Sequence, residues 1–243
     1  MTTQHPWRRP AAALHLAGAG LFLAGLALTP WEQENTAASY HDALAASPDQ
    51  AQAAALVLHF SYALLAAGAF ALLGVLGTGA PAGRWWRRAG APLVVLGATT
   101  MPGLLITDAY DLALAQAPSL DRDASAAVSD AVGETLLAGV IGASAMLGFI
   151  VGPLLLWVAA WRQRVVPGTV PALVLAAWIV GFASMELPVM LAGAALLIAA
   201  YGLASATLWW ERPSAETRAI TGFDADGEPG AHLEPATGSV AGA

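Results

Sequence analysis

Long apolar runs separated by short polar segments dominate the sequence. Most runs hold the roughly 17 to 25 apolar residues that a helix needs to cross the hydrocarbon core of a bilayer. The last apolar stretch, from Thr169 to Trp210, covers about 42 residues, or roughly 63 Å of helix, twice the thickness of that core. It has to fold back on itself, and Glu186 beside Pro188 marks the suitable turn. The pattern therefore predicts an all-α, polytopic integral membrane protein with six transmembrane helices in a bundle, near residues 11–29, 53–77, 91–107, 132–157, 169–185 and 188–209.

The first apolar run follows the basic segment Trp7-Arg8-Arg9-Pro10, an arrangement that also describes a secretory signal peptide. The run has about 18 residues, which is long for a signal core and long enough to span. No clear cleavage site of small residues follows before Pro30. We therefore expect a retained first helix. Cleavage is the alternative, and it would leave five helices with unchanged sidedness.

Composition indicates the same class of protein. Of the 243 residues, 57% are hydrophobic and only 11% are charged, with a mean hydropathy of +0.61; soluble domains have roughly 25% charged residues. The absence of cysteine excludes disulfides, thiolate metal sites and thiol nucleophiles. All ten basic residues are arginine, which, with the high alanine and glycine content, is typical of a GC-rich bacterial genome. We therefore expect a multi-pass protein of a bacterial plasma membrane.

The arginines are segregated along the chain, and their positions set the expected orientation. With a cytoplasmic N-terminus, six helices place residues 1–10, 78–90, 161–168 and 211–243 inside, and nine of the ten arginines fall there. Arginine in short loops favours the cytoplasmic side, so both termini are predicted to be cytoplasmic. The last of these segments is rich in Gly, Pro and acidic residues, and is expected to be a disordered tail.

The acidic residues have the opposite distribution. Eleven of them, against Arg122 alone, lie in the outer segments or at outer helix ends. Two interpretations stay open: the acids are solvated side chains of ordinary loops, or they form an anionic vestibule that concentrates cations by its summed field. The eleven are Glu32, Glu34, Asp42, Asp49, Asp108, Asp111, Asp121, Asp123, Asp130, Glu134 and Glu186.

Small residues recur every three or four positions in the fourth expected helix. Helices in lipid associate through close packing of small residues, so we expect this helix at the centre of the bundle. Pro92, Pro102 and Pro153 lie in or near helices, where proline kinks the chain and releases carbonyl groups. Such breaks either shape packing or frame a binding site. The small residues are Gly139, Gly142, Ala145, Gly148 and Gly152.

The two long outer segments loosely resemble each other. Residues 40–45 read Tyr-His-Asp-Ala-Leu-Ala, and residues 110–115 read Tyr-Asp-Leu-Ala-Leu-Ala. Duplication of a helical hairpin is one explanation, and chance in an alanine-rich chain is the other. Each segment is expected to carry a short helix at the membrane surface.

Polar residues near the outer helix ends are the candidates for function. An ionisable side chain within the membrane costs about 2.5–3.5 kcal/mol on insertion scales, so each one needs a reason. Convergence of a histidine with acids from several helices would suit a cation or a proton relay; the alternative is that each faces water separately. No pair has a ligand spacing such as His-x-x-x-His, so no metal is assigned. The binding hypothesis comprises His59, Asp108, Asp111, Glu134 and Glu186.

A haem held between two histidines is excluded for His15 and His59. His15 lies toward the inner end of the first helix, and His59 toward the outer end of the second. Their depths differ by about eleven residues, or roughly 16 Å along the membrane normal. One iron cannot bind both, and no cofactor is expected.

Two hypotheses for function remain for the transmembrane domain of residues 1–210. No nucleotide-binding, serine-hydrolase or metalloprotease motif is present, and no basic face for nucleic acid. The first hypothesis is a non-catalytic accessory or sensor subunit whose outer face meets a cation, another membrane protein or a second copy of the chain. The second is a small proton- or cation-coupled transporter or channel. The lack of a charge at the middle of any span favours the first.

Overall fold

The computed structural model describes residues 6–31, 36–77, 81–184 and 186–210, without the side chains of residues 104 and 105, and this part of the chain is helical with no strand. The helices belong to one compact unit, Met1–Trp209. The expected tail, residues 211–243, lies outside the described residues, as do Glu32 and Glu34.

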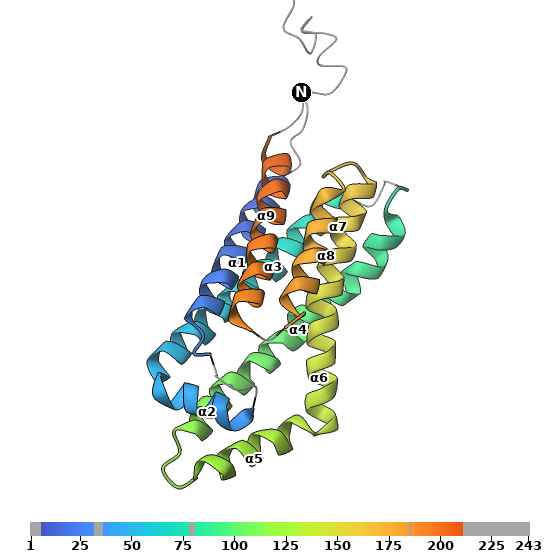
Figure 1. The fold of residues 1–243 in the computed structure, drawn as a ribbon. Helices are drawn as coiled ribbons and strands as arrows, with labels where there is room; N and C mark the ends of the chain where they lie inside the picture. The colour runs from blue at the N-terminus through green and yellow to red at the C-terminus, as the bar shows by residue number, and fades with distance from the viewer. Residues whose placement is uncertain (1–5, 32–35, 78–80, 185, 211–243) are drawn as a thin grey trace, which may run out of the picture. The chain divides into compact units, whose positions relative to one another are not determined.

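Five helices are long and apolar enough to cross a membrane, and a sixth apolar helix is shorter (Figure 1). The fourth long helix is continuous from Leu136 to Arg162 but contains three pieces, α6, η1 and α7. The short apolar helix is α8, Thr169–Gly181. Two further short helices, α2 (Ala37–Ala46) and α5 (Arg122–Gly133), lie between long ones. The long helices are α1 (Arg8–Leu28), α3 (Pro48–Leu76), α4 (Arg84–Ala115), α6 (Leu136–Met146) with η1 (Leu147–Val151) and α7 (Gly152–Arg162), and α9 (Leu187–Trp209).

The helix ends differ from the apolar runs mainly at α4 and α8. α4 has 32 residues, or about 48 Å at 1.5 Å per residue, because arginines at its start and the segment after Asp108 continue the helix that hydropathy limits to residues 91–107. α8 has 13 residues, or about 20 Å. Residues 132 and 133 belong to α5 rather than to the fourth long helix. Hydropathy predicts which residues can lie in lipid. It does not predict the helix ends, because backbone hydrogen bonding can continue into polar residues.

Two packed groups of helices make up the bundle. α1 packs against α3 and α9, and α8 packs against α9. α4 packs against α6, η1 and α7, while α3 contacts both α4 and α7 and so joins the groups (Figure 1). Arg8 at the start of α1, Arg84 at the start of α4 and Arg162 at the end of α7 lie at the end of the bundle opposite to α2 and α5.

The closest helix contact is between α4 and the η1–α7 segment, and it depends on glycine. A Cβ placed on Gly148 would lie 2.2 Å from the Gly97 backbone nitrogen, and one on Gly152 would lie 2.8 Å from the Val94 nitrogen. By contrast, Gly142 has no atom within 4 Å of such a Cβ. The expected small-residue contact therefore forms at Gly148 and Gly152 and not at Gly139 or Gly142.

A π-helical turn, Leu147–Val151, occurs at this contact. Proline in a helix lacks an N–H and its ring collides with the carbonyl four residues earlier; for Pro153 that carbonyl belongs to Phe149, within η1. A single widened turn accommodates such a collision. The turn also separates two environments: Leu136 of α6 is 84% exposed, whereas Leu156 and Trp157 of α7 are fully buried.

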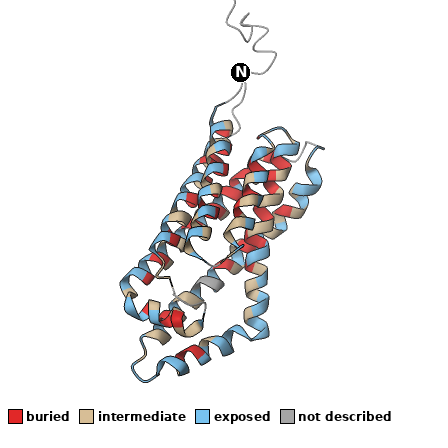
Figure 2. Ribbon diagram, in the orientation of Figure 1, coloured by how far each residue is buried: buried red, intermediate tan, exposed pale blue. Residues whose placement is uncertain are grey.

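Buried residues concentrate in α1, α3, α7, α8 and α9, whereas α5 and α6 are mostly exposed (Figure 2). Two aromatic groups fill this core. His15, Trp157 and Tyr201 pack with ring centroids 4.9 to 5.7 Å apart. Nearer the α2–α5 end, Phe149 packs against Tyr62 at 4.9 Å and against Trp178, 5.7 Å away. The aromatic groups join α1, α3, η1, α7, α8 and α9 through side chains that few other residues could replace.

We predict that Gly148→Ala destabilises the protein, because the new methyl group meets the Gly97 backbone, which cannot move aside like a side chain. Overpacking of this kind costs typically about 1–3 kcal/mol, occasionally more. Gly142→Ala is the matched control, since its methyl group meets nothing within 4 Å, and its stability should be unchanged or slightly raised. Unfolding of both variants in detergent, followed by circular dichroism, checks the difference; equal stability would contradict the contact.

Candidate functional site

Two short helices form a polar layer at one end of the bundle, and each begins at a side-chain cap. The Thr36 hydroxyl accepts a hydrogen bond from the Ser39 N–H at 3.2 Å, and Asp121 accepts one from the Ala124 N–H at 2.8 Å. Capping satisfies N–H groups that the first turn of a helix leaves unpaired. Helices of ten to twelve residues are still marginal in water, so α2 and α5 depend on their contacts with each other and with α4.

His41 is the centre of those contacts, and only 3% of it is exposed. Its Nδ1 lies 3.0 Å from the Ser125 hydroxyl on α5, and its Nε2 lies 3.8 Å from a carboxylate oxygen of Asp111 on α4. The Ser129 hydroxyl donates to the same carboxylate oxygen at 2.7 Å. We call His41, Asp111, Ser125 and Ser129 the His41 cluster. It ties three helices together through side chains.

The hydrogen-bond inventory fixes the role of each partner. The Ser125 hydroxyl donates its single proton to the Arg122 carbonyl at 2.9 Å, so the His41 Nδ1–H has to donate to Ser125. Nε2 then has no hydrogen-bond partner among the described residues. The cluster is thus a connection between α2, α4 and α5.

The order serine–histidine–aspartate invites comparison with a hydrolase triad, but the geometry does not suit one. A nucleophilic serine has to give its proton to the histidine and face a substrate. Here the Ser125 proton goes to the backbone of its own helix, and only 3% of the residue is exposed. The imidazole and the carboxylate are also separated by 3.8 Å. The cluster is arranged to hold helices rather than to attack a carbonyl group.

A small apolar group underlies the cluster. Leu44 of α2, Ala51 of α3 and Leu112 of α4 are buried together, with Tyr40 and Ala115 packed against them. These residues lie in or beside the two segments whose sequences resemble each other, so the resemblance corresponds to a contact: the segments pack against one another. An ion pair between Asp42 and Arg122 joins α2 to α5 at the surface.

The structure places the five residues of the binding hypothesis in different surroundings. Asp111 belongs to the His41 cluster, and Asp108 lies half-buried almost one turn before it on α4. His59 is exposed, with its ring 5.7 Å from that of Phe60. Glu134 is the exposed C-cap of α5, and Glu186 is exposed just before α9. Within the described ranges, no three His, Asp or Glu side chains are placed to hold a metal ion, so a shared binding role for the five stays a prediction.

The residues that sequence analysis missed are His41, Ser125 and Ser129. The spacing of these residues could have indicated their position. Ser125 and Ser129 are four residues apart, and His41 and Leu44 are three residues apart, so each pair lies on one face of a helix. Hydropathy alone gives these segments as polar loops, and it does not rank their polar residues by burial.

The fold defines the class: a helical protein with five described helices suited to cross a bilayer. Comparison with protein-family models, with curated proteins and with solved structures gave no match.

We predict that His41→Ala loosens α2 and α5, because it leaves the Ser125 hydroxyl and the Asp111 carboxylate short of a buried partner. Such a loss costs about 1–3 kcal/mol. Hydrogen exchange at the amides of α2 and α5 should accelerate, while exchange in α1 and α9 stays unchanged. His59→Ala is the control, since His59 is exposed. Unchanged exchange in α2 after His41→Ala would show that the cluster does not hold the layer.

Proposed function

We propose that the chain is a non-catalytic accessory or sensor subunit of a bacterial plasma membrane, with six membrane crossings and both termini in the cytoplasm. Its working surface is the extracytoplasmic layer made of α2, α5 and the end of α4. The layer offers a partner or a cation an ordered acidic face. The observation that carries the proposal is that a polar layer, held by its own buried contacts, covers one end of a tightly packed bundle.

The positions of charged and aromatic residues support this orientation. The helix ends that carry arginines lie opposite to α2 and α5 (Figure 1), and positive charge favours the cytoplasmic side. At that end Arg9 lies 5.7 Å from the centre of the Trp209 ring, and Arg162 lies 5.9 Å from that of Trp161. Indole and guanidinium groups are enriched at membrane interfaces. α8 makes the fifth crossing, shortened at both ends by turns.

The use of polar groups supports an accessory role over transport. In the outer layer, His41, Asp111 and Ser125 contact one another and hold helices together. In the bundle below, Trp157 and Tyr201 are at most 3% exposed. A transporter commonly places its coupling residues at interrupted helices near the membrane midplane, whereas the His41 cluster lies in the outer layer.

Transport is the second candidate, and His15 is the observation in its favour. An ionisable side chain enclosed in a membrane bundle is a functional hypothesis by default. His15 is 1% exposed, its Nδ1 pairs with the Ala11 carbonyl at 2.8 Å, and its Nε2 has no hydrogen-bond partner among the described residues. The rings of Trp157 and Tyr201 each lie 4.9 Å from the His15 ring, centroid to centroid. This close aromatic contact favours a packing role for His15.

We predict that single cysteines at positions 45 and 82 react from opposite sides of the membrane. The chain has no cysteine, so Ala45→Cys on α2 and Ala82→Cys before α4 each give one thiol at an exposed position. A membrane-impermeant maleimide should label residue 45 in intact cells and residue 82 only after permeabilisation. Labelling of both from the same side would overturn the orientation.

We predict that a photo-crosslinking amino acid at Val128 captures one discrete partner in membranes. Val128 is 37% exposed on the outer layer. The matched control is Leu175 of α8, which is 46% exposed on an apolar helix and should capture no protein. Adding His41→Ala should weaken the crosslink from Val128, because the layer loosens. A chain that stays monomeric in mild detergent and gives no crosslink from Val128 would contradict the proposal.

We predict that purified protein in liposomes carries no more proton or cation flux than protein-free liposomes. A pH-dependent flux that is lost in Glu134→Gln or in His59→Gln would contradict the accessory role and establish the second candidate. Expression and detergent-solubility measurements on the same variants separate loss of flux from loss of protein.

A further inference from the structure

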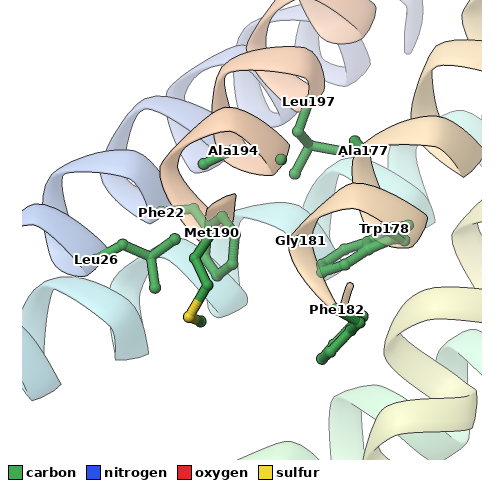
Figure 3. Close-up of a pocket in the computed structure, with 10 residues that line it drawn as sticks. Phe22, Leu26, Ala177, Trp178, Gly181, Phe182, Met190, Ala194 and Leu197 are labelled. Carbon is green, nitrogen blue, oxygen red and sulfur yellow. The ribbon is translucent and has the colours of Figure 1, made fainter. Parts of the chain in front are cut away.

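Two hollows lie one above the other along the end of α1 and the start of α9. The deeper one is an apolar cavity of about 40 Å³ between α1, α8 and α9 (Figure 3). Phe22, Leu26 and Met190 line it from α1 and α9, and Trp178 and Phe182 line it from α8 and its C-cap. Figure 3 shows Phe22, Leu26 and Met190 on one side and Trp178 and Phe182 on the other.

The second hollow is a polar recess of about 700 Å³ beside the short helix α2. It is bounded by the end of α1, by α2, by the start of α3, by Arg122 of α5 and by the start of α9. Among the residues that the structure describes, its charged groups are Asp42 and Arg122, which pair with each other. Trp31 and Gln50 face it as well, with their N–H groups held by the carbonyls of Leu26 and Leu28.

The two hollows are lined by neighbouring residues of the same helices. Leu26 of the cavity precedes Ala27 of the recess, and Met190 of the cavity follows Leu187 of the recess by three residues on one face of α9. The recess lies toward the end of the bundle where α1 finishes, and the cavity residues of α9 lie from Met190 to Leu197, about 5 to 15 Å deeper than Leu187 of the recess. In a bilayer, this order runs from headgroup depth to acyl-chain depth.

We propose that the two hollows form a binding site for a phospholipid with a zwitterionic head that contains a phosphate and a primary ammonium. The head occupies the recess, and the end of one acyl chain occupies the cavity. This site depends on the membrane location of the helices and not on the accessory role proposed above.

Charge complementarity selects the head. The described lining of the recess carries one guanidinium and one carboxylate, each 54% exposed. Exposed ion pairs contribute little to stability, so the pair can separate: Arg122 binds the phosphate with its fork of donors, and Asp42 accepts from the ammonium. A lipid with an anionic headgroup would place a negative charge beside the Asp42 carboxylate. A lipid without a phosphate would leave the Arg122 guanidinium without an anionic partner. Trp31 presents an indole ring, which suits headgroup depth.

The size and lining of the cavity select the chain. A volume of about 40 Å³ holds only a few water-sized groups, which suits the narrow end of an acyl chain and excludes a fused ring system. The walls are almost entirely apolar: Leu197 belongs to the main core, Phe22 packs against its edge, and Leu26 is buried. Gly181 borders the cavity with a vacant Cβ position, since an added Cβ would meet only the Gly193 Cα at 3.9 Å.

Photolabelling of the full-length protein in phosphatidylcholine liposomes tests the site. The probes are phosphatidylethanolamine and phosphatidylglycerol, each with a diazirine near the end of one acyl chain. We expect the ethanolamine probe to label peptides of α8 and α9 around the cavity about tenfold more than the glycerol probe, the ratio expected from one charge-assisted hydrogen bond. Asp42→Asn should raise labelling by the glycerol probe, whereas Arg122→Gln should reduce labelling by both.

Gly181→Leu fills the cavity and should abolish its adducts. Gly20→Leu on α1 is the matched control, since nothing lies within 4 Å of its Cβ, and it should label like the wild type. Met190→Phe is a second filling variant in case Gly181→Leu does not fold, with size-exclusion profiles reporting folding.

Three results would overturn the proposal. The first is equal labelling of the cavity peptides by both probes in the wild type. The second is unchanged labelling in a folded cavity-filling variant. The third is a protein–protein crosslink at the cavity in place of a lipid adduct, which would identify a second copy as its occupant.

Discussion

The fold depends on the approach of two backbones at Gly97 and Gly148. Lipid tails are as apolar as leucine, so helices gain little from burying apolar side chains against one another, and they associate through close packing and hydrogen bonds. At Gly148 an added Cβ would fall 2.2 Å from a backbone nitrogen, so the two helices approach more closely than a residue with a side chain would allow. Ser61 and Ser205 add the second kind of attraction, donating to carbonyls of α1 at 2.9 Å. α3, α4 and α9 are positioned by these contacts, and the polar layer rests on them.

The polar layer follows a different physical rule. In water, burial of a polar group is costly unless it is hydrogen-bonded. In the His41 cluster the imidazole Nδ1, the Asp111 carboxylate and the two serine hydroxyls are hydrogen-bonded, and the His41 Nε2 faces Asp111 at 3.8 Å. Apolar burial at Leu44 and Leu112 supplies the rest. The same chain thus uses small residues where lipid surrounds it and satisfied polar groups where water does. A partner or ligand at this end meets a surface with a defined shape rather than a pair of loops.

Much of the architecture could be predicted from the sequence, because bilayer thickness imposes a length on each apolar run. The runs near residues 11–29 and 188–209 correspond to α1 and α9 within three residues, and both outer segments carry the short helices that were expected. The helix ends at α4 could not be predicted, since Arg84 and Asp111 are polar yet helical. The His41 cluster was missed for a related reason: hydropathy registers that a residue is polar, and only the packing of α2 on α5 shows that it is buried. Asp111 was selected as a candidate, but for its depth rather than for its contact with His41.

The π-helical turn at Leu147–Val151 has a further effect on the molecule. One additional residue within a helical turn rotates everything on one side of it by about 100° relative to the other side. α7 keeps its phase through Gly152 and Leu156, which face α4 and the core; α6 beyond the turn is rotated, and Leu136 and Val140 point away from the bundle. α5 leads into α6 through the Thr135 cap. The rotation of α6 at the π-helical turn therefore affects where α5 lies and where Ser125 meets His41. The widened turn beside Pro153 thereby affects the direction of α5, a helix at the end of the bundle.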